Sequence, residues 1–147
     1  MVISWQVYCL IIAAATNAAL ALAVGLRLRT LAVAPLTASL VMCGLWAGFY
    51  AVELQASTLE LKVLAIQIRG LFMPFYMVVS YEAAHRFVTG RRSLTGWKLG
   101  ALLVVPLLAV VFNWLPDTAF FRYDYRIDST GPISVLQFAQ GPWARVL

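Results

Sequence analysis

Four long apolar runs constrain the fold of this chain more than any other feature of its sequence. They cover roughly residues 5–26, 31–52, 63–84 and 96–115, and short polar stretches separate them. Each run has the roughly 20 residues that a helix needs to cross a ~30 Å hydrocarbon core. Backbone polar groups in lipid must be satisfied within the segment, which favours helices. The pattern predicts an all-α membrane protein whose residues 1–112 form four transmembrane helices in an up-down bundle.

The composition agrees with a membrane protein and excludes an ordinary soluble domain. Of the 147 residues, 63% are hydrophobic and 12% are charged, and the mean hydropathy is +0.85. Soluble domains typically contain about 45–50% apolar and about 25% charged residues. The net charge of +5 does not indicate nucleic acid, because the basic residues flank the apolar runs and no base-reading motif accompanies them. Membrane lipid is the expected surrounding, with anionic head groups near the basic residues.

The basic residues are unevenly placed between the runs, and this predicts how the chain crosses the membrane. Arg27 and Arg29 follow the first run, whereas residues 53–62 and the region after Asn113 hold most of the acids. Lys and Arg close to a span favour the cytoplasmic side. The third connection and its edges carry Arg86, Arg91, Arg92 and Lys98. We therefore expect the first and third connections inside, and the N-terminus and residue 147 outside.

Small residues in the first two runs predict close packing between helices. The first run is rich in Ala around one polar residue, Asn17, and the second contains Gly44 and Gly48 in a GxxxG spacing. Small residues let membrane helices approach closely, and amides there often bond to a neighbouring helix. We expect Asn17 to bond to another helix rather than to a ligand. Gly44 and Gly48 are expected to serve packing within the bundle rather than a dedicated dimer interface.

Aromatic residues gather near the predicted outer boundary of the spans. Trp and Tyr are enriched where a helix meets the membrane surface. We interpret these residues first as an interfacial belt. They are Trp5, Tyr8, Trp46, Phe49, Tyr50 and Trp114.

The third run is the most polar, with Gln67, Arg69 and Pro74 inside it. Pro74 cannot donate a hydrogen bond to the carbonyl of Gly70, which predicts a kink. Arg69 lies two turns in from the outer end, where a charge facing lipid costs about 2.5–3.5 kcal/mol on insertion scales. Arg69 is therefore expected to face the interior or to reach an acid.

Glu53 and Glu60, at the outer ends of the second and third runs, are the nearest acids to Arg69 in the sequence. Two interpretations of Arg69 stand side by side. The ion pair fixes helix register, or it belongs to a ligand or switch site together with Gln67 and Pro74, because charges within a membrane often mark function. Glu82 and Arg86 are four apart, which favours a helical ion pair at the interface.

The sequence shows no enzyme. Its one histidine, His85, lies at a predicted membrane boundary, and Cys9 and Cys43 lie inside apolar runs without CxxC spacing. Neither a catalytic triad nor a phosphate-binding glycine loop is present. No metal site is indicated, and whether pigment or lipid occupies the bundle stays open.

After Asn113 the chain changes character and predicts an external β-hairpin. Residues 120–127 alternate apolar or aromatic side chains with charges, and residues 128–132 carry turn chemistry before a second apolar stretch. The loop is expected over residues 113–143, as a lid on the helix ends or as a face for a ligand or partner. Residues 144–147 would then begin a fifth span.

The order and spacing of several short elements carry a family resemblance. They are Trp46 to Leu54, Ser57 to Lys62, Gln67, Pro74, Asn113 and Gly141-Pro142-Trp143. Together they resemble the N-terminal seven-transmembrane sensor region of prokaryotic histidine kinases, through its first four spans. The resemblance implies an inner-membrane region that senses an external or membrane-borne signal and passes it to a cytoplasmic domain. It implies no particular ligand residues, and further spans would be needed after residue 147.

The leading functional hypothesis is therefore a non-catalytic, signal-receiving membrane domain whose partners are the remaining helices of a sensor. The alternative is a structural four-helix subunit that uses its small-residue faces to contact other subunits of a larger membrane complex. A transporter part ranks last, because the four runs show no inverted repeat.

Overall fold

The computed structural model describes residues 4–27, 30, 32–94, 96–114, 122–128 and 135–140. Arg29, Gly141-Pro142-Trp143 and residues 144–147 lie outside these ranges, so the expected turn into a fifth span does too. The elements are α1 (Trp5–Arg27), α2 (Val33–Gln55), α3 (Leu59–Thr89), α4 (Trp97–Trp114), β1 (Arg122–Asp128) and β2 (Val135–Gln140).

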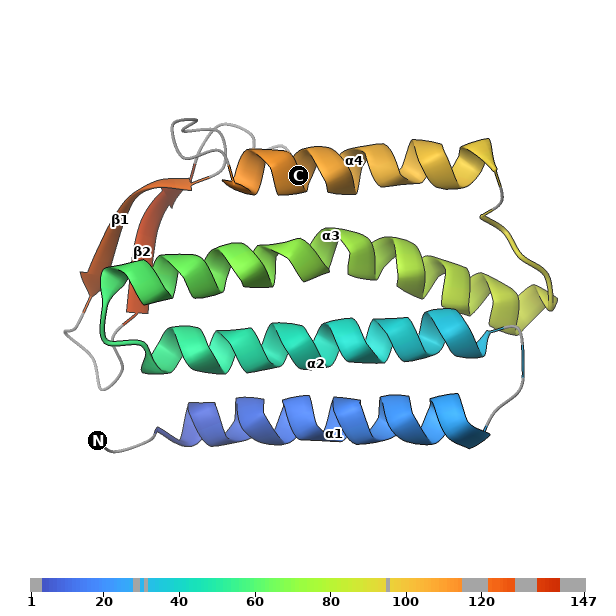
Figure 1. Ribbon diagram of the computed structural model, residues 1–147, viewed down its shortest axis with the longest axis horizontal. Coiled ribbons are helices and arrows are strands. Elements are labelled where there is room, and N and C mark those ends of the chain that lie inside the picture. Colours follow the sequence, from blue (N-terminus) through green and yellow to red (C-terminus); the bar gives the residue numbers. More distant parts are fainter. Residues whose placement is uncertain are drawn as a thin grey trace.

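The four helices lie side by side in chain order and alternate in direction (Figure 1). α1 packs along α2 and α2 packs along α3, whereas α4 contacts α3 less extensively. All four helices are long and apolar enough to cross a membrane. The predicted up-down arrangement of membrane helices is therefore confirmed.

The two ends of the bundle carry different elements and are called the hairpin end and the basic end (Figure 1). The hairpin end holds the first turn of α1, the connection between α2 and α3, and the strands. The basic end holds Arg27 and the connection between α3 and α4.

Helix α3 is longer than the predicted span of residues 63–84, and a capping interaction supports each of its ends. At the hairpin end, the Thr58 hydroxyl accepts a hydrogen bond from the Leu61 N–H at 3.4 Å, which is N-cap geometry. At the basic end, Gly90 adopts a left-handed conformation with φ of 67° and its N–H donates to the Arg86 carbonyl. The helix therefore extends about a turn beyond the apolar run at each end.

Pro74 lies inside α3, and the helix continues through it. Proline has no N–H to donate to the carbonyl four residues earlier, and its ring crowds that turn. Figure 1 shows α3 bowed along its length, while α2 beside it is straighter. The bend expected from Pro74 is thus taken up as a bow rather than a break.

The predicted hairpin is present as an antiparallel pair of β1 and β2. Its register pairs Arg126 with Gln137 and Asp128 with Val135, and shifts between Tyr123 and Arg126. Both strands contact α3, and Leu136 of β2 is buried. The hairpin therefore packs across the first turns of α3 instead of standing free of the helices (Figure 1).

Candidate functional site

A buried ion pair joins α2 to α3 near the hairpin end. Arg69 Nη1 lies 3.0 Å from Glu53 Oε2, and the two side chains are only 16% and 6% exposed. Glu53 is one of the two acids expected from the sequence. Glu60, the other, is exposed in the first turn of α3 and is not the partner in this pair.

Two aromatic rings of α2 flank the same guanidinium. The Arg69 Cζ lies 4.4 Å from the centroid of the Tyr50 ring and 5.6 Å from that of Trp46. Both distances fall within the roughly 6 Å at which a cation is attracted to an aromatic face. Trp46 and Tyr50, expected only as part of an interfacial belt, thus also hold Arg69 against α2.

Lys62 completes the cluster, and the sequence interpretation did not single it out. Its side chain is fully buried, and its Nζ donates a hydrogen bond to the backbone carbonyl of Glu53 at 2.8 Å. Glu53 lies in the last turn of α2, where carbonyls lack helical partners and the helix dipole favours a cation. The signal available in the sequence was a lysine one turn into α3, within reach of a helix that ends a few residues earlier.

Gln67 and Gly70 mark the place where α4 meets the bowed helix. The Asn113 side-chain amide donates to the Gln67 carbonyl at 2.9 Å. A Cβ at Gly70 would lie 3.0 Å from the Asn113 Nδ2, so this approach depends on glycine. Gln67 therefore contributes through its backbone, and α4 docks one turn before Pro74.

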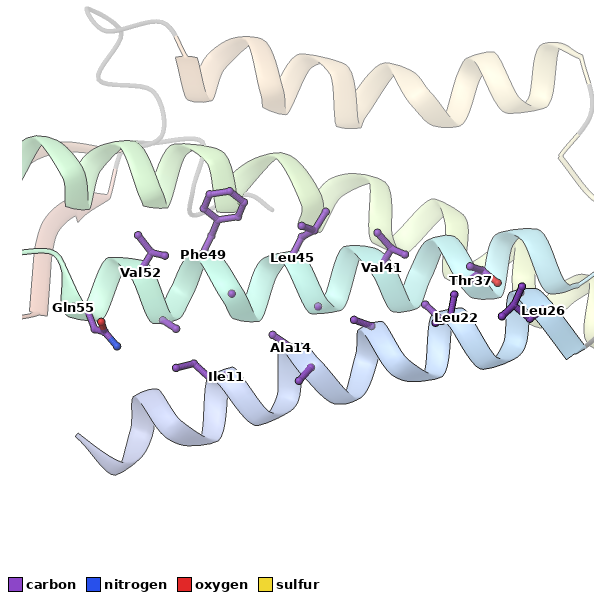
Figure 2. Close-up of a pocket in the computed structure, with 17 residues that line it drawn as sticks. Ile11, Ala14, Leu22, Leu26, Thr37, Val41, Leu45, Phe49, Val52 and Gln55 are labelled. Carbon is purple, nitrogen blue, oxygen red and sulfur yellow. The ribbon is translucent and has the colours of Figure 1, made fainter. Parts of the chain in front are cut away.

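An apolar groove of about 1040 Å³ runs between α1 and α2 (Figure 2). Gly44 and Gly48 both line it, but only Gly44 lies at a close contact, since a Cβ there would meet the Ala14 carbonyl oxygen at 3.3 Å. Asn17 packs at the same contact, and its amide donates to the Ala13 carbonyl within its own helix at 2.9 Å. The polar bond of Asn17 is thus intrahelical, and its aliphatic part does the packing.

The basic end contains a second buried carboxylate. Glu82 accepts from Arg86 Nε at 2.6 Å, as the spacing predicted, and also from the backbone N–H of Leu94 at 2.9 Å. The second bond ties the connection between α3 and α4 to the end of α3. His85 faces the same connection, with its Nδ1 3.3 Å from the Arg91 carbonyl oxygen.

Across the residues that the structure describes, no group of three His, Cys, Asp or Glu side chains could hold a metal ion. Cys9 and Cys43 are free thiols. The chemistry of the cluster around Arg69 is that of fixed charges and aromatic faces, which suits recognition or mechanical coupling.

Four membrane-length helices, two of which are joined through a buried charge cluster, define a multi-pass membrane domain. The family model for the N-terminal 7TM region of histidine kinase matches residues 9–147, and the chain belongs to this family. The resemblance seen in the sequence is therefore confirmed. No curated protein and no solved structure matches the chain.

Proposed function

We propose that this chain receives a signal at or within an inner membrane and transmits it to a cytoplasmic kinase domain through a change in how α3 packs on α2. The observation that carries the proposal is the Arg69–Glu53 pair, which fastens the bowed helix to its neighbour within the membrane-spanning region. Family membership supplies the sensor context.

The free energies associated with the contacts of Arg69 are of the order that such a change in packing requires. Breaking a buried ion pair by removing one partner costs about 3–5 kcal/mol, and a cation held on an aromatic face adds about 0.5–2 kcal/mol. Moving a two-state equilibrium from 1:99 to 99:1 takes about 5.5 kcal/mol. Because deleting one partner costs a free energy of this same order, we expect changes at this cluster to alter which packing dominates.

The two ends of the molecule support the orientation in which the hairpin end is extracytoplasmic. Arg27, Arg86, Arg91, Arg92 and Lys98 all belong to the basic end (Figure 1). Basic residues near membrane spans are retained on the cytoplasmic side. In this orientation the cluster around Arg69 is reached from outside or from the outer leaflet, and the α3–α4 connection faces the kinase.

The experiment compares Glu53→Gln and Arg69→Leu with a matched control, Glu60→Gln, in the complete gene product held in native membrane vesicles. Membrane insertion is measured first, and autophosphorylation from labelled ATP second. We expect all three variants to insert, the first two to change basal autophosphorylation severalfold, and the control to leave it unchanged.

Equal autophosphorylation in all three inserted variants would remove the cluster from the signalling path. A stoichiometric assembly with other membrane subunits after extraction in mild detergent would favour the structural-subunit alternative instead. These two outcomes are independent, because the first concerns the cluster and the second concerns the class of protein.

A further inference from the structure

A pocket at the basic end lies between the end of α3, the α3–α4 connection and the first turns of α4, away from the cluster around Arg69. Its volume is about 460 Å³, within the range of roughly 300–1,000 Å³ typical of small-ligand sites. Its lining residues are Tyr81, Ser93, Leu94, Trp97, Lys98, Ala101 and Leu102.

The exposed charged residues near this pocket are all basic. Lys98 lines it, Arg91 and Arg92 directly precede its Ser93, and all three basic side chains are exposed. Among the described residues none of the three forms a salt bridge. Residues 1–52 contain no acid, and Glu82 is the single acid between residues 61 and 116.

Glu82 does not offset these charges, because its own bonds already occupy it. It is 5% exposed, and its two carboxylate oxygens accept from Arg86 and from the Leu94 N–H. The pocket therefore presents the unneutralised charge of Lys98, and Arg91 and Arg92 add exposed positive charge in the connection that supplies its Ser93 and Leu94. The expected ligand is an anion.

The walls of the pocket are amphipathic, which distinguishes a lipid from a soluble anion. Ser93 and Lys98 are the polar part, while Ala101 and Leu102 continue along α4 into its apolar, exposed surface. Trp97 is 79% exposed and Tyr81 is 54% exposed. Exposed Trp and Tyr beside basic residues are typical of the level of the lipid head groups.

The connection that carries the basic residues is held in place by hydrogen bonds. Glu82 fixes the Leu94 N–H, and the Thr89 hydroxyl accepts from the Arg91 N–H at 3.3 Å. Because these bonds already order the connection, less conformational entropy is lost when a ligand binds.

We propose that this pocket binds the head group of an anionic phospholipid. The phosphate lies at Ser93 and Lys98, with Arg91 and Arg92 beside it, and the first acyl carbons follow Ala101 and Leu102. Trp97 and Tyr81 border the glycerol region. This assignment is independent of the signalling role proposed for Arg69, since it uses neither the cluster nor α2.

The test uses the 147-residue chain in detergent with equimolar phosphatidylglycerol and phosphatidylcholine, and measures bound lipid by native mass spectrometry. We expect the wild type to retain phosphatidylglycerol preferentially. Each basic residue near an anionic lipid surface contributes enough for about a fivefold change in affinity, so Arg92→Gln with Lys98→Gln should lower retention about 25-fold. Arg27→Gln, an exposed basic residue at the same end but outside the pocket, is the matched control.

The variants replace exposed side chains, and circular dichroism checks that their helix content is unchanged. Lys98→Gln alone serves as a second variant, with an expected loss of about fivefold. Equal loss in Arg27→Gln would show a diffuse charge effect and overturn the site. Complete displacement of the lipid by soluble glycerol phosphate would overturn the lipid assignment in favour of a soluble anion.

Discussion

The Lys62 ammonium group donates a hydrogen bond to the backbone carbonyl of Glu53 across the turn between α2 and α3. The carboxylate of the same Glu53 meets Arg69 at 3.0 Å. One residue of α2 therefore contacts two cations of α3, which lie two helical turns apart. This arrangement fixes both the end of α2 and the rotation of α3 about its own axis.

Replacing Lys62 with Met should destabilise the fold. A buried acceptor that loses its donor costs about 1–3 kcal/mol, and the methionine chain fills the same space without a charge. The free energy of unfolding in mixed micelles measures the loss. Glu60→Gln, an exposed change in the same turn of α3, should stay within about 0.5 kcal/mol of the wild type; similar values for both variants would contradict the importance of the Lys62 bond.

Replacing Gly44 with Ala should weaken the packing of α1 on α2. The added Cβ would lie 3.3 Å from the Ala14 carbonyl oxygen, a backbone atom that cannot rotate away. Overpacking of this kind typically costs about 1–3 kcal/mol.

Gly48→Ala is the matched control, since a Cβ there meets nothing within 4 Å. It should be neutral, or stabilising by up to about 1 kcal/mol through helix propensity. Unfolding of the two variants under identical conditions measures the difference. A cost at Gly48 equal to that at Gly44 would show that a second helix surface covers the groove.

Replacing Gly70 with Ala should displace Asn113 and with it the part of α4 at the hairpin end. The Cβ would lie 3.0 Å from the Asn113 Nδ2, which donates to the Gln67 carbonyl. Losing that bond costs about 0.5–1.5 kcal/mol, and the helix propensity of Ala returns up to about 1 kcal/mol.

A double-mutant cycle separates these two terms. In an Asn113→Ala background the contact is already gone, so Gly70→Ala should become stabilising. The same effect of Gly70→Ala in both backgrounds would mean that Asn113 is not what requires glycine at this position.

The proposed orientation can be measured by cysteine labelling. In a background where Cys9 and Cys43 are replaced by Ala, Ser57→Cys should react with an impermeant maleimide on intact cells, and Arg91→Cys only after the membrane is opened. Both positions are exposed and lie at opposite ends of α3. The reverse labelling pattern would invert the proposed topology.

The sequence alone predicted the four helices and, of the ion pair, the arginine that needs a partner. Hydrophobic length predicted four spans, and the cost of a charge in lipid predicted that Arg69 needs an acid. It left Glu53 and Glu60 as equal candidates, because choosing between them requires the rotation of α3 against α2. That rotation is set by packing between residues distant in sequence.

Other details were beyond sequence reasoning for similar physical reasons. Lys62 lies where the polar stretch between the second and third apolar runs ends, and lysines at such places usually extend into water. Only the position of the α2 terminus shows that the Lys62 side chain is buried. Gly44 and Gly48 are equivalent in a GxxxG pattern, yet only Gly44 lies at the α1 contact. The bond from Asn113 to Gln67 joins α4 to a backbone atom, which no side-chain pattern encodes.

The bond between Glu82 and the Leu94 N–H has a mechanical consequence. It ties Leu94 of the following connection to the last turns of α3, which restrains how far that part of the connection can move away from α3. We therefore expect a tilt of α3 to displace the start of α4 instead of being absorbed by the connection. Lengthening that connection with Gly and Ser, rather than altering any charge, is the change that would uncouple the two helices.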